Sequence, residues 1–292
     1  MRALGTQRIV EVEPRRVFGW TGEEVAVVGQ GTWMLEESDR EIALEALAGG
    51  MDAGMTLMDT AEMYGNGMAE EIVGEAIRGR RSEVFLVSKV LPSNASYDGT
   101  LRACERSLKR LGVDRIDLYL LHWESRYPIA ETMRAMETLA DRGLIRYIGV
   151  SNFDVEKLQE AEAALKSQRL ACNQILFHLK DRGIERRLLP YCREREIAVM
   201  GYSPFGHGDF PKQNTAGRRI LEEIAQRHKK TARQTALNFL ASHGVFIIPK
   251  SCDVQHVLEN SGGAGWGLTE AEYQIIDHAF PAPDHDVPLG MI

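Results

Sequence analysis

The feature that most constrains this chain is a regular alternation of short apolar runs with segments of helical periodicity. The runs have the length of strands, and the segments between them are long enough for helices that cross back over a sheet. This alternation is typical of βαβ units, and near-continuous apolar runs fit parallel strands buried on both faces. The eight runs are Val25–Gly29, Thr56–Asp59, Val84–Lys89, Ile116–His122, Ile145–Ser151, Ala171–Ile175, Ile197–Ser203 and Val245–Ser251. Eight strands favour a closed barrel, so we expect an α/β fold, a single (β/α)8 TIM barrel.

The segments around these runs add detail to the expected barrel. Residues 17–27 contain two short strands around a Thr-Gly-Glu-Glu turn, which predicts an N-terminal β-hairpin. Extra helices are expected late in the chain, near Arg218–His228 and Ala232–His243, and another opens at Thr269, where Glu272 completes a capping box. The earlier helices are expected at Arg40–Ala53, Thr100–Leu111, Thr132–Arg142, Val155–Leu165 and Glu185–Arg195. No linker interrupts the pattern, so we expect one domain over residues 1–292.

Charge and composition exclude several classes of function. The net charge is −7 and both signs are interspersed, whereas nucleic-acid-binding proteins usually carry a concentrated basic face. The N-terminus lacks a secretory h-region, and no segment approaches the roughly 20 apolar residues of a membrane span. The four cysteines are scattered, and the eight histidines show no metal-ligand spacing. We therefore expect a cytoplasmic protein that binds no nucleic acid, membrane or catalytic metal.

An acid, a phenol and an amine lie at or just beyond the ends of two neighbouring expected strands. Asp59 ends one apolar run, Tyr64 follows it by five residues, and Lys89 ends the next run. A phenol has a pKa near ~10 and is a poor proton donor at neutral pH unless a cation stabilises its phenolate. A lysine held by a carboxylate supplies such a cation, so the three residues form a candidate proton-donating group.

The other strands also finish in polar residues, which in a barrel gather at the face that carries the active site. These residues are His122, Ser151, Asn152, Gln174, Tyr202, Ser203, Lys250 and Ser251. The set holds no obvious pair of nucleophile and base. Amides and hydroxyls can orient a flat polar ligand, and a lysine-assisted phenol can protonate an oxyanion. Together they suggest reduction of a carbonyl by a bound hydride donor.

The usual open-sheet nucleotide fingerprint is absent. Residues 29–34 begin like G-x-G-x-x-G, but Met34 stands at the last position. A better phosphate site is Ile248–Ser251, where a lysine and a hydroxyl precede an expected helix N-terminus. The same four residues would also fit a surface loop with a solvated lysine.

In order and spacing, these motifs resemble those of the aldo-keto reductase superfamily over nearly the whole chain. The matching segments are GQGTW at 29–33, MDTAEMYGNG at 58–67, VSK at 87–89, DLYLLHW at 117–123, IGVSNF at 148–153, CNQILFH at 172–178, GYSPFG at 201–206 and IPKSCDVQHVLEN at 248–260. The resemblance implies a catalytic tetrad of Asp59, Tyr64, Lys89 and His122. Tyr64 would be the general acid, and Lys89 would lower its pKa. Asp59 would form an ion pair with Lys89, and His122 would orient the substrate carbonyl.

The resemblance also implies a bound NADPH. Its nicotinamide end would be held by Ser151, Asn152, Gln174 and, through ring stacking, Tyr202, and its phosphates by the Ser203 loop and by Lys250 and Ser251. The complete set of cofactor-binding residues is Gly31, Thr32, Asp59, Ser151, Asn152, Gln174, Tyr202, Ser203, Phe205, Gly206, Lys250, Ser251, His256, Glu259 and Asn260, and Trp33 and Trp123 would bind substrate.

The chain departs from the family pattern at three positions. Phe177 and Leu179 stand where the family has tyrosine and proline, which we expect to alter packing only. His256 stands where most members place an arginine that grips the 2′-phosphate. Histidine is mostly neutral at pH 7 when unperturbed, whereas arginine is always charged. We therefore expect a weaker and more pH-dependent preference for NADPH, with NADH as an alternative cofactor.

Two classes of function follow from these observations. The first is an NAD(P)H-dependent carbonyl reductase that converts aldehydes or ketones to alcohols, with a small-molecule carbonyl substrate and a monomeric or weakly oligomeric state. The second is a nicotinamide-binding regulatory subunit on the same fold, with vestigial turnover. The short segment Glu124–Pro128 and the modest tail beyond Asn260 predict an open substrate pocket.

Overall fold

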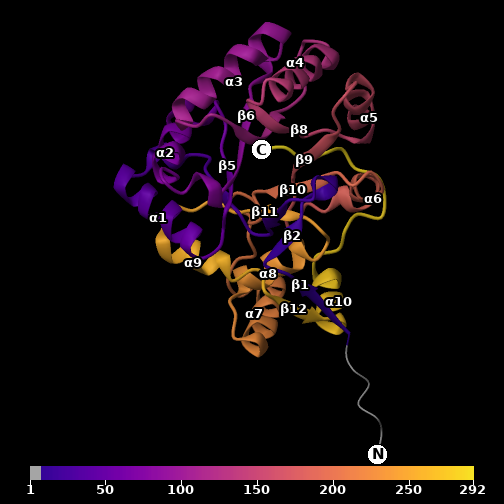
Figure 1. The fold of residues 1–292 in the computed structure, drawn as a ribbon. Coiled ribbons are helices and arrows are strands. Elements are labelled where there is room, and N and C mark those ends of the chain that lie inside the picture. The colour runs from indigo at the N-terminus through magenta and orange to yellow at the C-terminus, as the bar shows by residue number, and fades with distance from the viewer. Residues whose placement is uncertain (1–7) are drawn as a thin grey trace, which may run out of the picture.

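A closed parallel sheet of eight strands forms the centre of the protein (Figure 1). The structure is a computed structural model and describes residues 8–292. The expectation about a secretory signal falls partly on residues 1–7, which lie outside the described residues. The strands are β4 (Gln30–Gly31), β5 (Leu57–Asp59), β6 (Phe85–Val90), β7 (Ile116–Leu121), β8 (Ile145–Ser151), β9 (Leu170–Leu176), β10 (Ala198–Tyr202) and β11 (Phe246–Ile248). They pair in chain order, and bridges from Val28 to Ile247 and from Gly31 to Lys250 join the first strand to the last. The predicted (β/α)8 barrel is confirmed.

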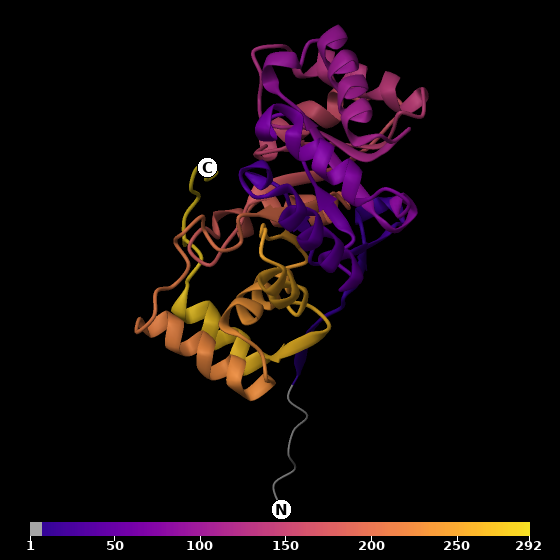
Figure 2. The ribbon, with the colours of Figure 1, turned by 90° about the vertical axis from the view of Figure 1, so that its left-hand side faces the viewer.

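Helices surround this barrel in the order that the sequence predicts. They are α1 (Arg40–Asp52), α2 (Met68–Ala76), α3 (Tyr97–Leu111), α4 (Ile129–Asp141), α5 (Val155–Ala164), α6 (Leu188–Glu194), α7 (Ala216–His228), α8 (Ala232–Ala241), α9 (Val254–Ser261) and α10 (Glu270–Ala279). Both α7 and α8 lie between β10 and β11, as expected for the extra helices. The capping box at Thr269 and Glu272 is present and opens α10. Figure 2 shows α7 (orange) and α10 (yellow) side by side, with the chain after α10 turning back toward the barrel.

The predicted hairpin closes the N-terminal end of the barrel, and it consists of β2 (Arg15–Val17) and β3 (Glu24–Ala26). The expectation that Val25–Gly29 forms the first barrel strand is right only for its second half. Val25 and Ala26 pair with β2 in the hairpin, whereas Val27 and Gly29 form backbone hydrogen bonds with Ile247 of β11. The first barrel strand is β4, two residues long. Gly29 lies against β5 so closely that a Cβ there would come within 2.6 Å of the Leu57 carbonyl oxygen.

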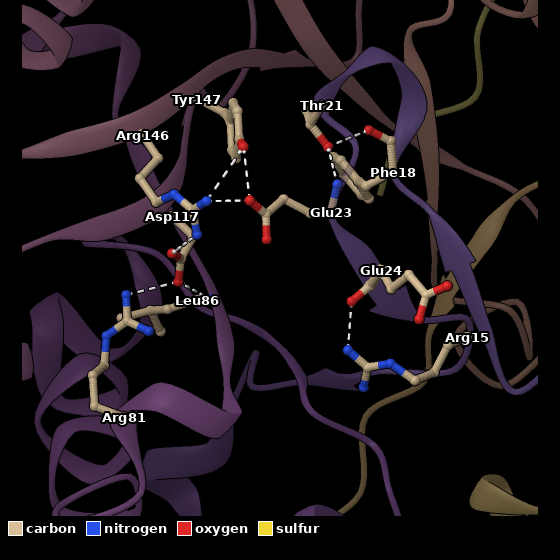
Figure 3. Close-up of polar contacts among 10 residues, drawn as sticks. All are labelled: Arg15, Phe18, Thr21, Glu23, Glu24, Arg81, Leu86, Asp117, Arg146 and Tyr147. Carbon is tan, nitrogen blue, oxygen red and sulfur yellow. Dashed lines mark hydrogen bonds and ion pairs between the residues drawn. The ribbon is translucent and has the colours of Figure 1, made fainter.

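A chain of ion pairs fastens the hairpin to the barrel strands (Figure 3). Glu23 accepts hydrogen bonds from Arg146 and from the Tyr147 hydroxyl on β8. Arg146 also pairs with Asp117 on β7, at 3.4 Å, and Asp117 pairs with Arg81 at 2.7 Å. Arg146 and Arg81 therefore both have carboxylate partners.

A second small sheet joins the two ends of the chain. It pairs β1 (Ile9–Val12) antiparallel with β12 (Trp266–Thr269), a strand that the sequence did not predict. Gly267 is required there, because a Cβ would lie 2.7 Å from the Val10 carbonyl oxygen.

The apolar runs of the sequence form the core. Every residue of β6, β7 and β9 is buried, as expected for parallel strands covered by helices on one side and barrel interior on the other. Within residues 8–292, no helix has the length and apolar character that crossing a bilayer requires.

Candidate active site

The acid, the phenol and the amine predicted from the sequence meet at one end of the barrel. Asp59 is the last residue of β5, and Lys89 is the fifth residue of β6. Tyr64 begins a short 3₁₀ turn after β5, in which Gly65, Asn66 and Gly67 all have positive φ. Glycine adopts such angles without strain, so these residues allow the tight turn that brings the phenol back over the strand ends.

Lys89 is the centre of this group. Its side chain is fully buried, and its Nζ donates hydrogen bonds to Asp59 Oδ2 at 2.7 Å, to the Thr60 carbonyl oxygen at 2.9 Å and to the Tyr64 hydroxyl oxygen at 3.1 Å. Gln174 on β9 donates to the other oxygen of Asp59 at 2.7 Å. The three donors of the ammonium are thereby directed at three oxygens, which fixes its position relative to the phenol.

Burial and charge act on this group in opposite directions. Burial alone would lower the pKa of Lys89, but the Asp59 carboxylate and Tyr64 outweigh it, so the pKa is raised and the amine stays protonated. Burial raises the pKa of Tyr64, and the Lys89 charge partly offsets that rise. As expected, the Lys89 charge acts to lower the pKa of Tyr64, but burial has the larger effect and the pKa is raised overall.

His122 directly follows β7 and lies beside the phenol. Its ring meets that of Tyr64 edge-on, with centroids 5.7 Å apart, and the Trp123 ring is tilted against it with centroids 4.7 Å apart. Burial, followed by the nearby Lys89 charge, lowers the pKa of His122 to about 2, so the imidazole is neutral. Its buried Nδ1 has no hydrogen-bond partner within residues 8–292.

The ends of β8, β9 and β10 bring the predicted nicotinamide-binding residues together. Asn152 Nδ2 donates to Ser151 Oγ at 3.1 Å and to the His122 carbonyl oxygen at 3.2 Å, while Asn152 Oδ1 accepts from the Tyr202 hydroxyl at 2.8 Å. Asn152 has a φ of 61°, a left-handed conformation that asparagine tolerates better than most residues. Ser151 Oγ keeps its own proton to donate, so the cluster can offer hydrogen bonds to a planar amide, as a nicotinamide requires.

These residues line one cavity of about 240 Å³ at the C-terminal ends of the strands. Its walls hold Tyr64 and His122 together with the two predicted substrate-binding residues, Trp33 and Trp123. The other predicted residues that line it are Gly31, Thr32, Asp59, Ser151, Asn152, Gln174, Tyr202, Ser203 and Lys250. Lys89 lies behind them, out of reach of solvent. A barrel fold predicts a site at this face, and the cavity agrees with that rule.

Four further lining residues were missed by sequence reasoning: Met63, Ile248, Met291 and Ile292. Met63 and Ile248 adjoin predicted residues, and their apolar character gave no signal. The last two belong to the C-terminal tail, which is tied down where Arg186 donates to Asp286 at 3.0 Å and to the Asp284 carbonyl oxygen at 2.6 Å. The open pocket expected from the modest tail is therefore partly walled by that tail.

The remaining predicted residues do not line the cavity. Phe205 and Gly206 follow β10, and Ser251, His256, Glu259 and Asn260 lie in or just before α9. The first turn of α9 is capped by Asp253, whose Oδ1 accepts from the His256 backbone N–H at 3.1 Å. One N–H at the start of α9 is therefore already bonded to an acid. The positive charge nearest to this helix start in the predicted set is Lys250, whose side chain is exposed.

Comparison with known proteins agrees with this geometry. The model of the Aldo/keto reductase family matches residues 27–280. The chain is 44% identical to the methylglyoxal reductase YeaE of Escherichia coli, over 95% of this chain and 99% of that protein. It is 34% identical to a glyoxal reductase of Bacillus subtilis, over 88% and 89% of the two chains.

Solved structures resemble the whole barrel. An aldo/keto reductase from Klebsiella pneumoniae, in complex with NADP and acetate, superposes with a TM-score of 0.90 at 39% identity, covering 96% of this chain and 100% of that one. A Klebsiella pneumoniae structure in complex with NADPH gives a TM-score of 0.89 at 40% identity, over 96% and 100%. With the matched family model and these identities over nearly full length, the chain belongs to the aldo/keto reductase family.

Proposed function

We propose that the protein is an NADPH-dependent reductase of small aldehydes and ketones, in which Tyr64 is the general acid. The observation that carries this proposal is the position of the Tyr64 hydroxyl, 3.1 Å from the buried Lys89 ammonium and on the wall of the same cavity as His122. An acid for carbonyl reduction needs a proton to give and a cation to stabilise the anion left behind, and this pair provides both.

A bound reduced nicotinamide supplies the hydride to the carbonyl carbon. Tyr64 donates its proton to the carbonyl oxygen, and the Lys89 ammonium stabilises the phenolate that results. Asp59 keeps Lys89 charged and in place. Neutral His122 lines the cavity and orients the substrate carbonyl by a hydrogen bond. Because its pKa is about 2, it does not compete as a proton donor near neutral pH.

The cofactor is assigned to residues on both sides of the cavity. Ser151, Asn152, Gln174 and Tyr202, which line the cavity, would hold the nicotinamide end. Gly31, Thr32, Asp59, Ser203, Phe205 and Gly206 would hold the middle of the cofactor. Lys250, Ser251 and His256 would bind the 2′-phosphate, and Glu259 and Asn260 would lie on the adenine side. The donor set of amides, hydroxyls and one aromatic ring fits such a cofactor.

We assign small dicarbonyls as the substrate class. The cavity of about 240 Å³ holds both the nicotinamide end of a cofactor and the substrate, so it favours short substrates. Methylglyoxal and glyoxal reductases are among the relatives, and two tryptophans wall the cavity. A cytoplasmic location remains the expectation for an enzyme of this kind.

The test is NADPH oxidation by the purified protein with methylglyoxal, glyoxal and an aromatic aldehyde, with the alcohol product identified. The proposal predicts turnover with NADPH that is fastest for the dicarbonyls. Cofactor binding without turnover on any carbonyl would instead support a nicotinamide-binding regulatory subunit.

A further inference from the structure

The end of the barrel opposite the active site holds a second cavity with no assigned role. It has a volume of about 270 Å³ and lies between the hairpin strand β2, helix α6 and the N-terminal ends of β10 and β11. Since one water occupies about 30 Å³ of liquid, this space can hold several waters or a small ion. It does not share a lining residue with the active-site cavity.

Arg16 of β2 lines this cavity with an uncompensated charge. Its Nη1 is completely enclosed and has no hydrogen-bond partner within the part of the chain that the structure describes. Its Nη2 donates only to the carbonyl oxygen of Ala241, the last residue of α8, at 3.2 Å. The guanidinium also lies over the Phe246 ring, 5.9 Å from its centroid. A buried guanidinium without an anion is unfavourable, and burial lowers the pKa of Arg16 accordingly.

Two other arginines of the protein show what Arg16 lacks. Arg182 is 2% exposed, and it pairs with Glu185 at 2.6 Å and Asp277 at 2.6 Å. Arg146, which is partly buried, pairs with Glu23 and Asp117 (Figure 3). Both guanidinium groups therefore have carboxylate partners, while no ion pair joins Arg16 to a carboxylate within residues 8–292.

The other ionisable side chains around the cavity leave its charge positive. Arg193 of α6 adds a second guanidinium, bonded only to the His243 carbonyl oxygen at 3.4 Å. Glu196 is the one acid of the lining, but its side chain is 66% exposed and lies 3.5 Å from Arg169. Cys192 is a neutral thiol, because burial raises its pKa to about 12.

The His243 imidazole does not change this balance. Its Nδ1 lies 2.9 Å from the Phe239 carbonyl oxygen, and its Nε2 lies 3.1 Å from the Tyr273 hydroxyl and 3.3 Å from Glu185. Both ring nitrogens are therefore engaged with α8, α10 and the loop before α6, so the ring has no nitrogen left for a ligand in the cavity.

We propose that this cavity binds a small oxyanion, such as inorganic phosphate, between the guanidinium groups of Arg16 and Arg193, neither of which is paired with a carboxylate among the described residues. A guanidinium presents parallel N–H donors that match two oxygens of a phosphate or carboxylate. The bound anion would join the hairpin to α6 and to the end of α8, and so stabilise the closed end of the barrel. This site is independent of the proposed reductase activity.

The test measures phosphate binding by calorimetry at constant ionic strength, in a Lys250→Met background that removes the anion site expected at the cofactor end. Acetate serves as a second probe, to separate recognition of a phosphate from that of any carboxylate. Arg16→Gln should weaken phosphate binding by about tenfold or more, the loss expected for a charge-assisted hydrogen bond, and Arg16→Lys should retain part of the affinity. The matched control is Arg80→Gln, which removes an arginine charge already paired with Asp52 and Glu83.

A second readout is thermal unfolding, which phosphate should raise in the Lys250→Met protein and in the Arg80→Gln control but not in Arg16→Gln. If Arg16→Gln does not fold, Arg193→Gln on the exposed face of α6 provides the same comparison, with a severalfold weaker phosphate affinity expected. Equal phosphate affinity in the background protein and in the Arg16 or Arg193 variant would overturn the proposal. So would the absence of any phosphate binding, which would leave Arg16 as a cap for the α8 carbonyls.

Discussion

The Lys89 ammonium donates a hydrogen bond to the Tyr64 hydroxyl oxygen across 3.1 Å, although 25 residues separate the two in the chain. The donor direction matters, because an oxygen that accepts from a cation is prepared to carry negative charge. Replacing Lys89 with methionine keeps the volume and removes this charge. We expect Lys89→Met to lower kcat for carbonyl reduction by about 10²-fold or more, with a much smaller change in NADPH affinity, as measured by steady-state kinetics and cofactor fluorescence.

The rate of reduction should depend on pH through the proton on Tyr64. Burial raises the pKa of Tyr64, so the phenol stays protonated at neutral pH and the rate should fall only when the pH rises above about 10, the ordinary range of a tyrosine. In Lys89→Met the opposing effect of the ammonium is lost, so this falling limb should move to still higher pH. A limb at or below neutral pH in the wild type would contradict this assignment.

His122 should make the protein sensitive to acid. Its pKa is about 2 in the folded protein, far below the ordinary value near 6.5, so the unfolded chain binds a proton that the folded one does not. The stabilising effect is complete above about pH 6.5 and is lost as the pH falls, at up to about 1.4 kcal/mol per unit. Urea unfolding between about pH 4 and 7 should show a shallower loss for His122→Gln, and parallel curves would argue against a neutral buried imidazole.

Asp59 should contribute to stability as well as to catalysis. Asp59→Asn leaves the fully buried Lys89 without its carboxylate, which we expect to cost about 3–5 kcal/mol in the free energy of unfolding. The control is Asp52→Asn, which breaks an ion pair with Arg80 where the aspartate side chain is 68% exposed and should change stability little. Equal losses in the free energy of unfolding for the two substitutions would show that the buried ion pair contributes no more to stability than the exposed one.

The site could be predicted largely from the sequence because it depends on strand ends. Asp59, His122 and Ser151 each follow a run of apolar residues, and parallel strands bring their carboxyl ends together whatever the details of packing. The capping box at Thr269 is similarly local. These features need only neighbouring residues to be recognised.

The parts that could not be predicted depend on long-range pairing. Val25 looks like a barrel strand by its apolar neighbours, and only its pairing with Arg16 assigns it to the hairpin. The pairing of Ile9 with Thr269 joins segments 260 residues apart, and Ile292 reaches the cavity only because Arg186 holds the tail. The assignment of the whole chain to one domain stays a prediction.

The C-terminal tail gives a further test of the substrate pocket. Removing Met291 and Ile292, which line the cavity, should raise KM for small dicarbonyls and widen the range of bulkier aldehydes accepted, with NADPH affinity unchanged. Gly290→Ala should act in the same direction, because its Cβ would lie 2.0 Å from Asp181 Oδ2 and displace the tail. Unchanged KM values in both proteins would show that these residues do not contact substrate.

His256 should determine how strongly the enzyme distinguishes its two cofactors. Arginine carries a permanent charge and presents parallel N–H donors to a phosphate, so His256→Arg should bind NADPH more tightly than the wild type. The affinity for NADH, which lacks the 2′-phosphate, should not change. Equal NADPH affinity in the wild type and in His256→Arg would contradict a phosphate contact at this position.

The central claim is tested most directly by Tyr64→Phe, which removes one hydroxyl group from the cavity wall. NADPH binding and a single turnover with methylglyoxal should be measured on the same preparations of wild type and variant. The account predicts unchanged NADPH affinity and a hydride-transfer rate lower by about 10²- to 10⁴-fold, the usual contribution of a general acid. A variant that binds NADPH and reduces methylglyoxal at the wild-type rate would show that Tyr64 is not the proton donor.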